Sequence, residues 1–266
     1  MLEGEGALYL PFLNKFIAWP LDFDVHGFAS KHDIQIAAES IVRHGGLVTF
    51  LAKYSNQISG QESVFNESCD LGCFSCGKTL IKNVKVFNTP AENWRELLDC
   101  WACHKESFLV STQATGLLPK EGVAFRTADS LIIKSESSSC SSCNVEIGVS
   151  DGAGNVKYYI SRITLNGKHR TSDQVLIDKL ESAKDLHSVH SFEVSDPKGN
   201  SFGLGVISWD SIIFQPDPVR GIVFRYDSQG SGAGERVELH EHDFCNVLES
   251  IKRNNTPLGL CYLRKK

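Results

Sequence analysis

The sequence predicts a mainly β fold of the α+β class, with antiparallel sheets, a few peripheral helices and zinc-knuckle hairpins. Short runs of β-favouring residues alternate with turn signals, as in residues 145–149, 156–165 and 192–226. Few segments have the helical period of apolar residues. Two Cys-x-x-Cys pairs lie between strand-like runs, which is typical of metal-binding hairpins.

Length and composition are those of a globular protein. The chain has 266 residues, of which 41% are hydrophobic and 22% charged, so a sizeable core is expected. We predict a single domain over residues 1–266, with a division into 1–165 and 166–266 as the alternative. The net charge of −5 argues against direct nucleic-acid binding, because no whole-chain field attracts a polyanion.

The expected location is the cytoplasm or the nucleus. No stretch reaches the roughly 18 to 20 apolar residues that span a bilayer, so no membrane partner is expected. The start of the chain lacks the basic region of a signal peptide. In a reducing compartment, nine cysteines indicate metal binding or catalysis more than a disulfide framework.

In the first half, one helix is expected to begin at Ser30 and run to Ile41, although Ile34 and Ile36 also alternate as in a strand. Residues 47–54 and 79–87 are predicted strands.

The clearest helix follows, with Thr89 as its cap, Pro90 in its first turn and Glu92 completing a capping box. One apolar stripe on this helix is expected to face the core: Trp94, Leu97, Leu98 and Trp101.

In the second half, residues 151–155 are a predicted turn between the strands 145–149 and 156–165. Asp173 is expected to cap a helix, and residues 192–226 are predicted to form a meander. A last helix is predicted over residues 243–252.

Cys73, Cys76, Cys140 and Cys143 are the candidate zinc ligands. Each pair has the spacing of a zinc knuckle, in which a tight turn directs two sulfurs toward one ion. Gly77 and Asn144 follow the pairs, and both residue types accept the left-handed backbone that such turns need. Two facing knuckles would form a closed site with four thiolates.

Spacing alone leaves the ligand pairing open. Cys100, Cys103 and His104 are alternative or additional ligands, because residues three apart share a helix face and the histidine adds a nitrogen. A buried thiol pair or a redox pair is the competing interpretation of a single Cys-x-x-Cys, but thioredoxin-like chemistry needs a βαβ setting. Cys69, Cys245 and Cys261 are isolated, which is typical of small core residues.

Several of these motifs together resemble one family. The residues are Cys73-x-x-Cys76-Gly77, Glu92-Asn93-Trp94-x-Glu96-Leu97, Trp101-x-Cys103-His104, Cys140-x-x-Cys143, Gly148 and Lys157-Tyr158. The chain resembles the HECT-like ubiquitin-conjugating-enzyme-binding proteins, mainly over residues 73–165. The resemblance implies a ubiquitin-protein ligase whose partners are a ubiquitin-conjugating enzyme, ubiquitin and a protein substrate or client. It also implies a stabilising role toward the mRNA 3′-end processing nuclease.

Two functions are therefore expected as alternatives. A ligase acting through a thioester needs an exposed cysteine, and zinc ligands cannot serve because the ion holds the thiolate. HECT ligases place the nucleophile near the C-terminus, so the resemblance favours Cys245 as the catalytic residue. The alternative is a non-catalytic, zinc-fastened adaptor or chaperone for a partner protein.

Overall fold

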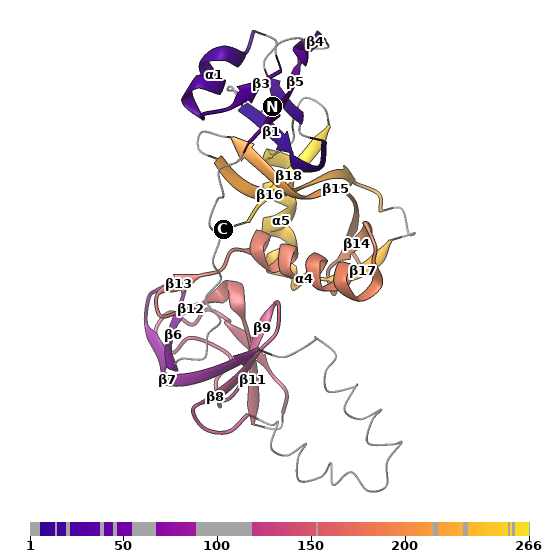
Figure 1. Ribbon diagram of the computed structural model, residues 1–266. Helices are drawn as coiled ribbons and strands as arrows, with labels where there is room; N and C mark the ends of the chain where they lie inside the picture. Colours follow the sequence, from indigo (N-terminus) through magenta and orange to yellow (C-terminus); the bar gives the residue numbers. More distant parts are fainter. Residues whose placement is uncertain are drawn as a thin grey trace, which may run out of the picture. The chain divides into compact units, whose positions relative to one another are not determined.

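The described strands form two sheets (Figure 1). Buried apolar residues cluster against each sheet. The structure is a computed structural model that describes residues 6–13, 15–19, 22–37, 40–44, 47–54, 68–88, 119–152, 154–214, 218–230, 234–254, 256 and 259–265. Within them, strands far outnumber the three α-helices, so the predicted mainly β class is confirmed.

The chain divides into two compact units. Residues 1–61 and 172–266 form the first unit, and residues 62–171 form the second. The number of domains stays a prediction.

The first unit holds the ten-stranded sheet and the three described α-helices. Seven of its strands follow the order β17-β14-β15-β1-β2-β5-β3, while β16 joins β15 to β18 and β4 pairs with β5. The elements are β1 (Gly6–Leu10), the 3-10 helix η1 (Pro11–Leu13), β2 (Lys15–Trp19), α1 (Val25–Lys31), β3 (Gln35–Ile36), β4 (Val42–His44), β5 (Leu47–Lys53), α4 (Ser172–His187), β14 (Ser191–Ser195), β15 (Ser201–Phe214), β16 (Pro218–Asp227), β17 (Glu235–Glu238), α5 (Glu241–Arg253) and β18 (Leu260–Arg264).

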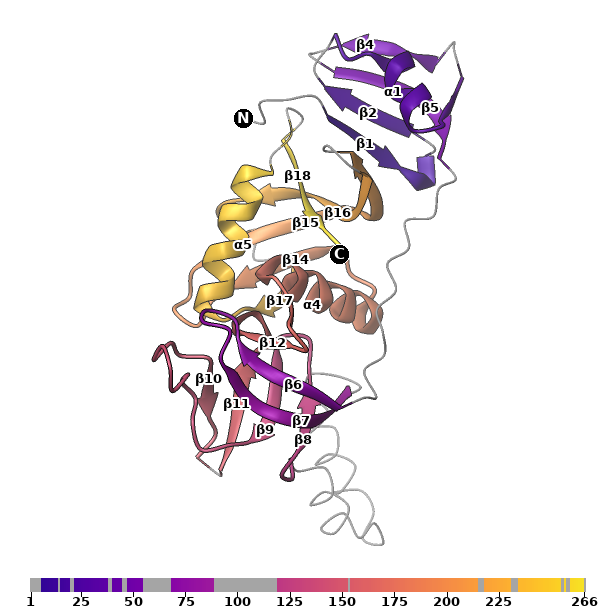
Figure 2. The same cartoon turned by 90° about the vertical axis from the view of Figure 1, so that its left-hand side faces the viewer.

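The predicted meander is confirmed, because β14, β15 and β16 are consecutive antiparallel neighbours. The sheet is not purely antiparallel, since β17 pairs with β14 in parallel. Two intervening strands give the chain the length that a parallel return requires. Helices α4 and α5 lie side by side and both contact β18 (Figure 2).

The prediction of a helix from Ser30 to Ile41 is wrong. The helix lies earlier, at Val25–Lys31, where the Asp24 side chain accepts a hydrogen bond from the backbone N–H of Gly27. Asp33 has a left-handed backbone (φ 52°), which ends the helical path. The next residues pair with β5 as strand β3, following the alternation of Ile34 and Ile36.

Two helix starts also differ from expectation. Asp173 does not cap α4, because the helix begins at Ser172 and Asp173 lies in its first turn. Its carboxylate instead accepts a hydrogen bond from Ser250 Oγ of α5 at 2.6 Å. The last helix is confirmed and begins slightly earlier than predicted, with His240 at its N-cap.

Asp196 organises the hairpin between β14 and β15. Its carboxylate accepts hydrogen bonds from the Asn200 side chain (2.7 Å) and from the backbone N–H groups of Asn200 (2.8 Å) and Lys198 (3.0 Å). These bonds, led by the Asn200 side chain, lower the pKa of Asp196 below its usual value. The residue is 5% exposed.

Replacing Asp196 by Asn is expected to lower the melting temperature at pH 7 by about 5 °C, because charge-assisted bonds are lost. A carboxyl group with a lowered pKa stabilises the fold above its unfolded pKa of about 3.9. The difference between wild type and variant should therefore shrink as pH falls through the folded pKa of Asp196. Asp227→Asn is the control, because Asp227 is exposed and caps one backbone N–H. Equal pH profiles of both variants would contradict the assignment.

The described residues of the second unit form one sheet, whose buried apolar side chains make one cluster. Its strand order is β10-β11-β9-β8-β7-β6-β12-β13, and all pairs are antiparallel except β7 with β8. The elements are β6 (Ser68–Cys73), β7 (Thr79–Asn88), β8 (Val123–Arg126), β9 (Ser130–Lys134), β10 (Gly148–Ser150), β11 (Asn155–Tyr159), the 3-10 helix η4 (Ile160–Arg162), β12 (Ile163–Leu165) and β13 (Lys168–His169). The three-residue helix η4 links β11 directly to β12. These two strands lie near opposite ends of the strand order, so the short link keeps the two ends of the sheet close together.

The predicted strands at 47–54 and 79–87 are confirmed as β5 and β7. The strand predicted over 145–149 is only partly confirmed, since β10 begins at Gly148 and Glu146 forms an isolated bridge with Ser139. The predicted helix from Thr89, with its Trp94 and Trp101 stripe, lies outside the described residues. Among the described helices, none is long and apolar enough to cross a membrane.

Candidate metal centre

The two Cys-x-x-Cys turns of the second unit have the same backbone hydrogen bonds. In the first turn, Cys73 N–H donates to the Lys78 carbonyl (2.8 Å), and Gly77 N–H donates to the Cys73 carbonyl (2.9 Å). Gly77 has φ of 71°, which a residue with a Cβ rarely adopts. We call residues 73–78 the first knuckle.

The second turn repeats this pattern with other residues. Cys140 N–H donates to the Val145 carbonyl (2.9 Å), and Asn144 N–H donates to the Cys140 carbonyl (2.8 Å). Asn144 has φ of 57°, so it takes the left-handed position that Gly77 takes in the first turn. We call residues 140–145 the second knuckle.

The four sulfurs of the two knuckles converge. Cys73 Sγ lies 3.7 Å from Cys143 Sγ, and Cys76 Sγ lies 3.6 Å from Cys140 Sγ. All four ligand atoms lie within 4.8 Å of one another. A tetrahedral zinc site with Zn–S bonds of about 2.3 Å has sulfur–sulfur edges of roughly 3.8 Å. The cluster could therefore bind a metal ion, and its four thiol ligands are consistent with a zinc site.

The thiols of the cluster affect one another's pKa values. The backbone N–H groups of Cys143 and Ser142 lower the pKa of the Cys140 thiol to about 6. The N–H of Val145 lowers the pKa of Cys143, but burial and the neighbouring thiols, such as that of Cys76, outweigh it and raise the value to about 12. Thiols this close cannot all ionise without a cation, because each thiolate opposes the ionisation of the next.

Arg162 connects the two knuckles. Its carbonyl accepts a hydrogen bond from Phe74 N–H of the first knuckle (3.1 Å). Its Nη1 donates to the carbonyl of Glu146, next to the second knuckle (3.2 Å). Its Nε is buried and has no hydrogen-bond partner among the described residues, so the guanidinium keeps one free donor. Arg162 therefore ties the two turns together through its main chain and its side chain.

The segment before the second knuckle is held by Tyr158 of β11. The Tyr158 hydroxyl donates to the Ser137 carbonyl (3.0 Å) and lies 2.9 Å from Ser135 Oγ. Gly148 pairs with Tyr158, and a Cβ at Gly148 would lie 2.4 Å from the Lys157 carbonyl oxygen. The strand can pass this close only without a side chain at position 148.

The structure thus brings together Cys73, Cys76, Cys140 and Cys143, as the sequence predicted for a site with four thiolates. Cys100, Cys103 and His104 lie outside the described residues. The bridging role of Arg162 was not predicted, and no local pattern in the sequence signals it. The sequence indicated Tyr158 only as part of the Lys157-Tyr158 strand motif and did not predict its hydrogen bonds.

The remaining described cysteines differ in exposure. Cys69 and Cys261 are buried, as expected of small core residues, whereas Cys245 is exposed on α5. Burial, together with the charge of Asp70, raises the pKa of Cys69. Burial raises the pKa of Cys261 to about 11. Both buried thiols are therefore poor nucleophiles at neutral pH.

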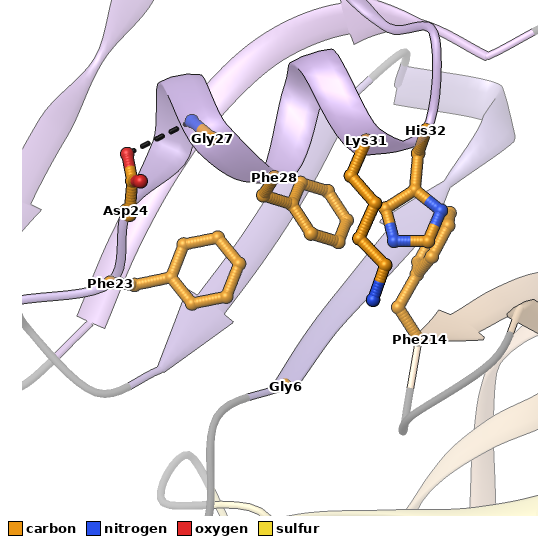
Figure 3. A pocket seen from close by; sticks show the side chains of 8 residues that line it. All are labelled: Gly6, Phe23, Asp24, Gly27, Phe28, Lys31, His32 and Phe214. Carbon is orange, nitrogen blue, oxygen red and sulfur yellow. Dashed lines mark hydrogen bonds between the residues drawn. The ribbon is translucent and has the colours of Figure 1, made fainter.

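The first unit has a pocket of about 360 Å³ (Figure 3). It is lined by Gly6, Phe23, Asp24, Gly27, Phe28, Lys31, His32 and Phe214. The rings of Phe28, His32 and Phe214 pack against one another, with centroids 4.7 to 5.0 Å apart. The Asp24 carboxylate at the edge of the pocket accepts a hydrogen bond from Gly27 N–H at 2.9 Å and so caps the first turn of α1.

Comparison with known protein families identifies the chain. A model of the HECT-like ubiquitin-conjugating enzyme (E2)-binding family matches residues 37–221, well over half of the sequence and all four clustered cysteines. The chain belongs to this family. Cys245 and most of the pocket lie outside the segment that matches the HECT-like E2-binding model.

Individual relatives are distant. The chain is 24% identical to the E3 ubiquitin-protein ligase E3D of Mus musculus over 185 residues, which cover 58% of this chain and 49% of the relative. It is 23% identical to an uncharacterized protein of Schizosaccharomyces pombe over 170 residues, 57% of this chain and 51% of that one. Human E3D is 39% identical over 51 residues, 18% and 13% of the two chains. The chain spans about half the length of the first two relatives, and no solved structure matches it.

Proposed function

We propose that the protein is a ubiquitin-protein ligase that binds a ubiquitin-conjugating enzyme and passes ubiquitin to a protein substrate. The observation that carries this proposal is the match to the E2-binding family over residues 37–221. The distant likeness to E3D ligases supports it. The cytoplasm and the nucleus remain the proposed locations.

We propose zinc as the resident metal of the four-cysteine cluster. Cys73, Cys76, Cys140 and Cys143 would hold it as a closed structural site, because four protein thiolates leave no position for substrate. The ion would fasten the two knuckles together and take no part in transfer.

The thiol proposed to carry ubiquitin is Cys245. It is the exposed cysteine among the described residues outside the four-cysteine cluster, while Cys69 and Cys261 are buried. A thioester relay requires an accessible sulfur that can reach the thioester of the conjugating enzyme. The burial of the other two excludes them from this role.

Charged groups surround Cys245. Glu241 lies one helical turn before it on α5, and the Lys198 ammonium forms an ion pair with Glu241. The Glu241 carboxylate, and to a smaller extent Cys245, raise the pKa of Lys198, so this side chain stays cationic beside the sulfur.

The transfer consists of two exchanges. The Cys245 thiolate attacks the thioester carbonyl of the charged conjugating enzyme, forms a new thioester and releases the enzyme's cysteine as a thiolate that takes up a proton. A substrate amine then attacks the new thioester, loses a proton on forming the amide, and returns the Cys245 thiol.

A non-catalytic adaptor that stabilises a partner, such as the mRNA 3′-end processing nuclease implied by the resemblance, is the second candidate. Cys245 lies outside the matched segment 37–221, which includes the complete four-cysteine cluster. The features shared with the family therefore do not require this thiol.

A non-reducing gel separates the two functions. The wild-type protein is incubated with ubiquitin, activating enzyme and a panel of conjugating enzymes. A ligase of the proposed kind should acquire a ubiquitin adduct that thiol reagents remove. Binding of a conjugating enzyme without any adduct would favour the adaptor.

A further inference from the structure

An aromatic ring is exposed at the first knuckle. Phe74 lies between Cys73 and Cys76, and 52% of it is accessible to solvent. Burying an exposed aromatic side chain is a large source of binding free energy, and such residues dominate protein interfaces. The position of Phe74 beside two metal-ligand candidates calls for an explanation other than core packing.

The ring is held in one orientation. Phe74 N–H donates to the Arg162 carbonyl (3.1 Å), and its ring stacks on the His169 imidazole with centroids 3.5 Å apart and planes 12° apart. The knuckle turn is closed by the Cys73 to Lys78 hydrogen bond. A side chain held in this way loses little conformational freedom when a partner binds, so more of the contact energy appears as affinity.

The two chain segments next to the Phe74 ring are rich in basic residues. Residues 162–170 include β12, which pairs with β6, and His169 of β13. Together with the first knuckle they contain four basic residues and no Asp or Glu, although the whole chain has a net charge of −5. The basic residues are Lys78, Arg162, Lys168 and Arg170. A zinc ion with four thiolates would contribute a net charge of −2, so the region stays positive when metal is bound.

We propose that this surface, the knuckle face (residues 73–78 and 162–170), is the docking site for the ubiquitin-conjugating enzyme, with Phe74 entering an apolar hollow that has an acidic rim. The inference rests on the proposed function. Both segments of the knuckle face lie within residues 37–221, the segment matched to the E2-binding family. A rigid aromatic residue surrounded by positive charge fits a partner surface that is apolar at its centre and acidic around it.

The test measures binding of a panel of recombinant ubiquitin-conjugating enzymes to the full chain by biolayer interferometry. Phe74→Ala is expected to weaken binding of the enzymes that wild type binds by at least about tenfold. Phe87→Ala is the matched control, because Phe87 is 46% exposed in the same unit, on β7. It should change Kd by less than about twofold.

A second pair of variants tests the charge. Lys168→Glu should weaken binding and reduce its sensitivity to salt, because one favourable charge is replaced by an unfavourable one. Lys134→Glu, at the exposed end of β9, is the control and should have little effect. Unchanged zinc content and melting temperature of Phe74→Ala show that any loss of binding is not caused by unfolding.

The outcomes distinguish the inference from the proposed function. Wild-type binding that persists in both Phe74→Ala and Lys168→Glu would overturn the knuckle face and leave the proposed function intact. Failure of wild type to bind any conjugating enzyme would overturn both. A 20-nucleotide single-stranded RNA is the second probe, and RNA binding abolished by Phe74→Ala, without loss of enzyme binding, would reassign the face to nucleic acid.

Discussion

Cys140→Ser is expected to abolish metal binding and unfold the second unit. Cys140 is fully buried, and its sulfur lies 3.6 Å from the sulfur of Cys76. Its loss therefore removes a ligand that no other described residue can replace. Structural zinc contributes roughly 10 to 16 kcal/mol of binding free energy, as much as the whole stability of a typical domain, about 5 to 15 kcal/mol. Chelation of metal from wild type should have the same effect.

Metal analysis and hydrogen exchange over residues 68–165 measure this result. Wild type should purify with at least one equivalent of zinc, and exchange in this segment should rise after chelation. Cys69→Ala is the matched control, because Cys69 is a buried cysteine of the same core that lies outside the cluster. It should retain zinc and lose only about 1 to 2 kcal/mol. A zinc-free wild type with a fully protected second unit would refute the prediction.

Cys245→Ala is expected to reduce ubiquitin transfer at least about a thousandfold, because a relay without its nucleophile has no covalent intermediate. Cys245 is exposed on α5, so the variant should keep its melting temperature and zinc content. Cys245→Ser should instead collect an ester-linked ubiquitin that resists thiol reagents, since oxygen replaces sulfur in the acyl bond.

Single-turnover transfer from a charged conjugating enzyme provides the measurement. Glu249→Ala serves as the control, because Glu249 is exposed one helical turn after Cys245 and has no thiol that could form a thioester. Full activity of Cys245→Ala would exclude this residue as the nucleophile.

The metal centre was largely predictable from local sequence. A Cys-x-x-Cys pair followed by Gly77 or Asn144 specifies a tight turn, because its hydrogen bonds join residues four and five apart and its left-handed position suits those residue types. The strands at 47–54 and 79–87 were predictable for a similar reason, as β-favouring runs are read over a few residues.

Short-range signals failed where two local structures compete. Residues 30–33 have the pattern of a helix start. In the structure, Asp24 caps an earlier helix, and Gln35 and Ile36 pair with β5 as a strand. Pairing energy from a distant strand is invisible to a local pattern.

The sequence by itself determined the two Cys-x-x-Cys turns, with their four cysteines among the metal-ligand candidates, and the mainly β class. Only the tertiary structure decided that Cys73 faces Cys143 and Cys76 faces Cys140, that Arg162 bridges the two knuckles, and that Cys245 is exposed while Cys69 and Cys261 are buried. The physical reason is the distance along the chain between the residues that interact. Turn geometry depends on hydrogen bonds between near neighbours, whereas convergence and burial depend on how β6, β11 and β12 pair across the sheet of the second unit and how α5 meets β18.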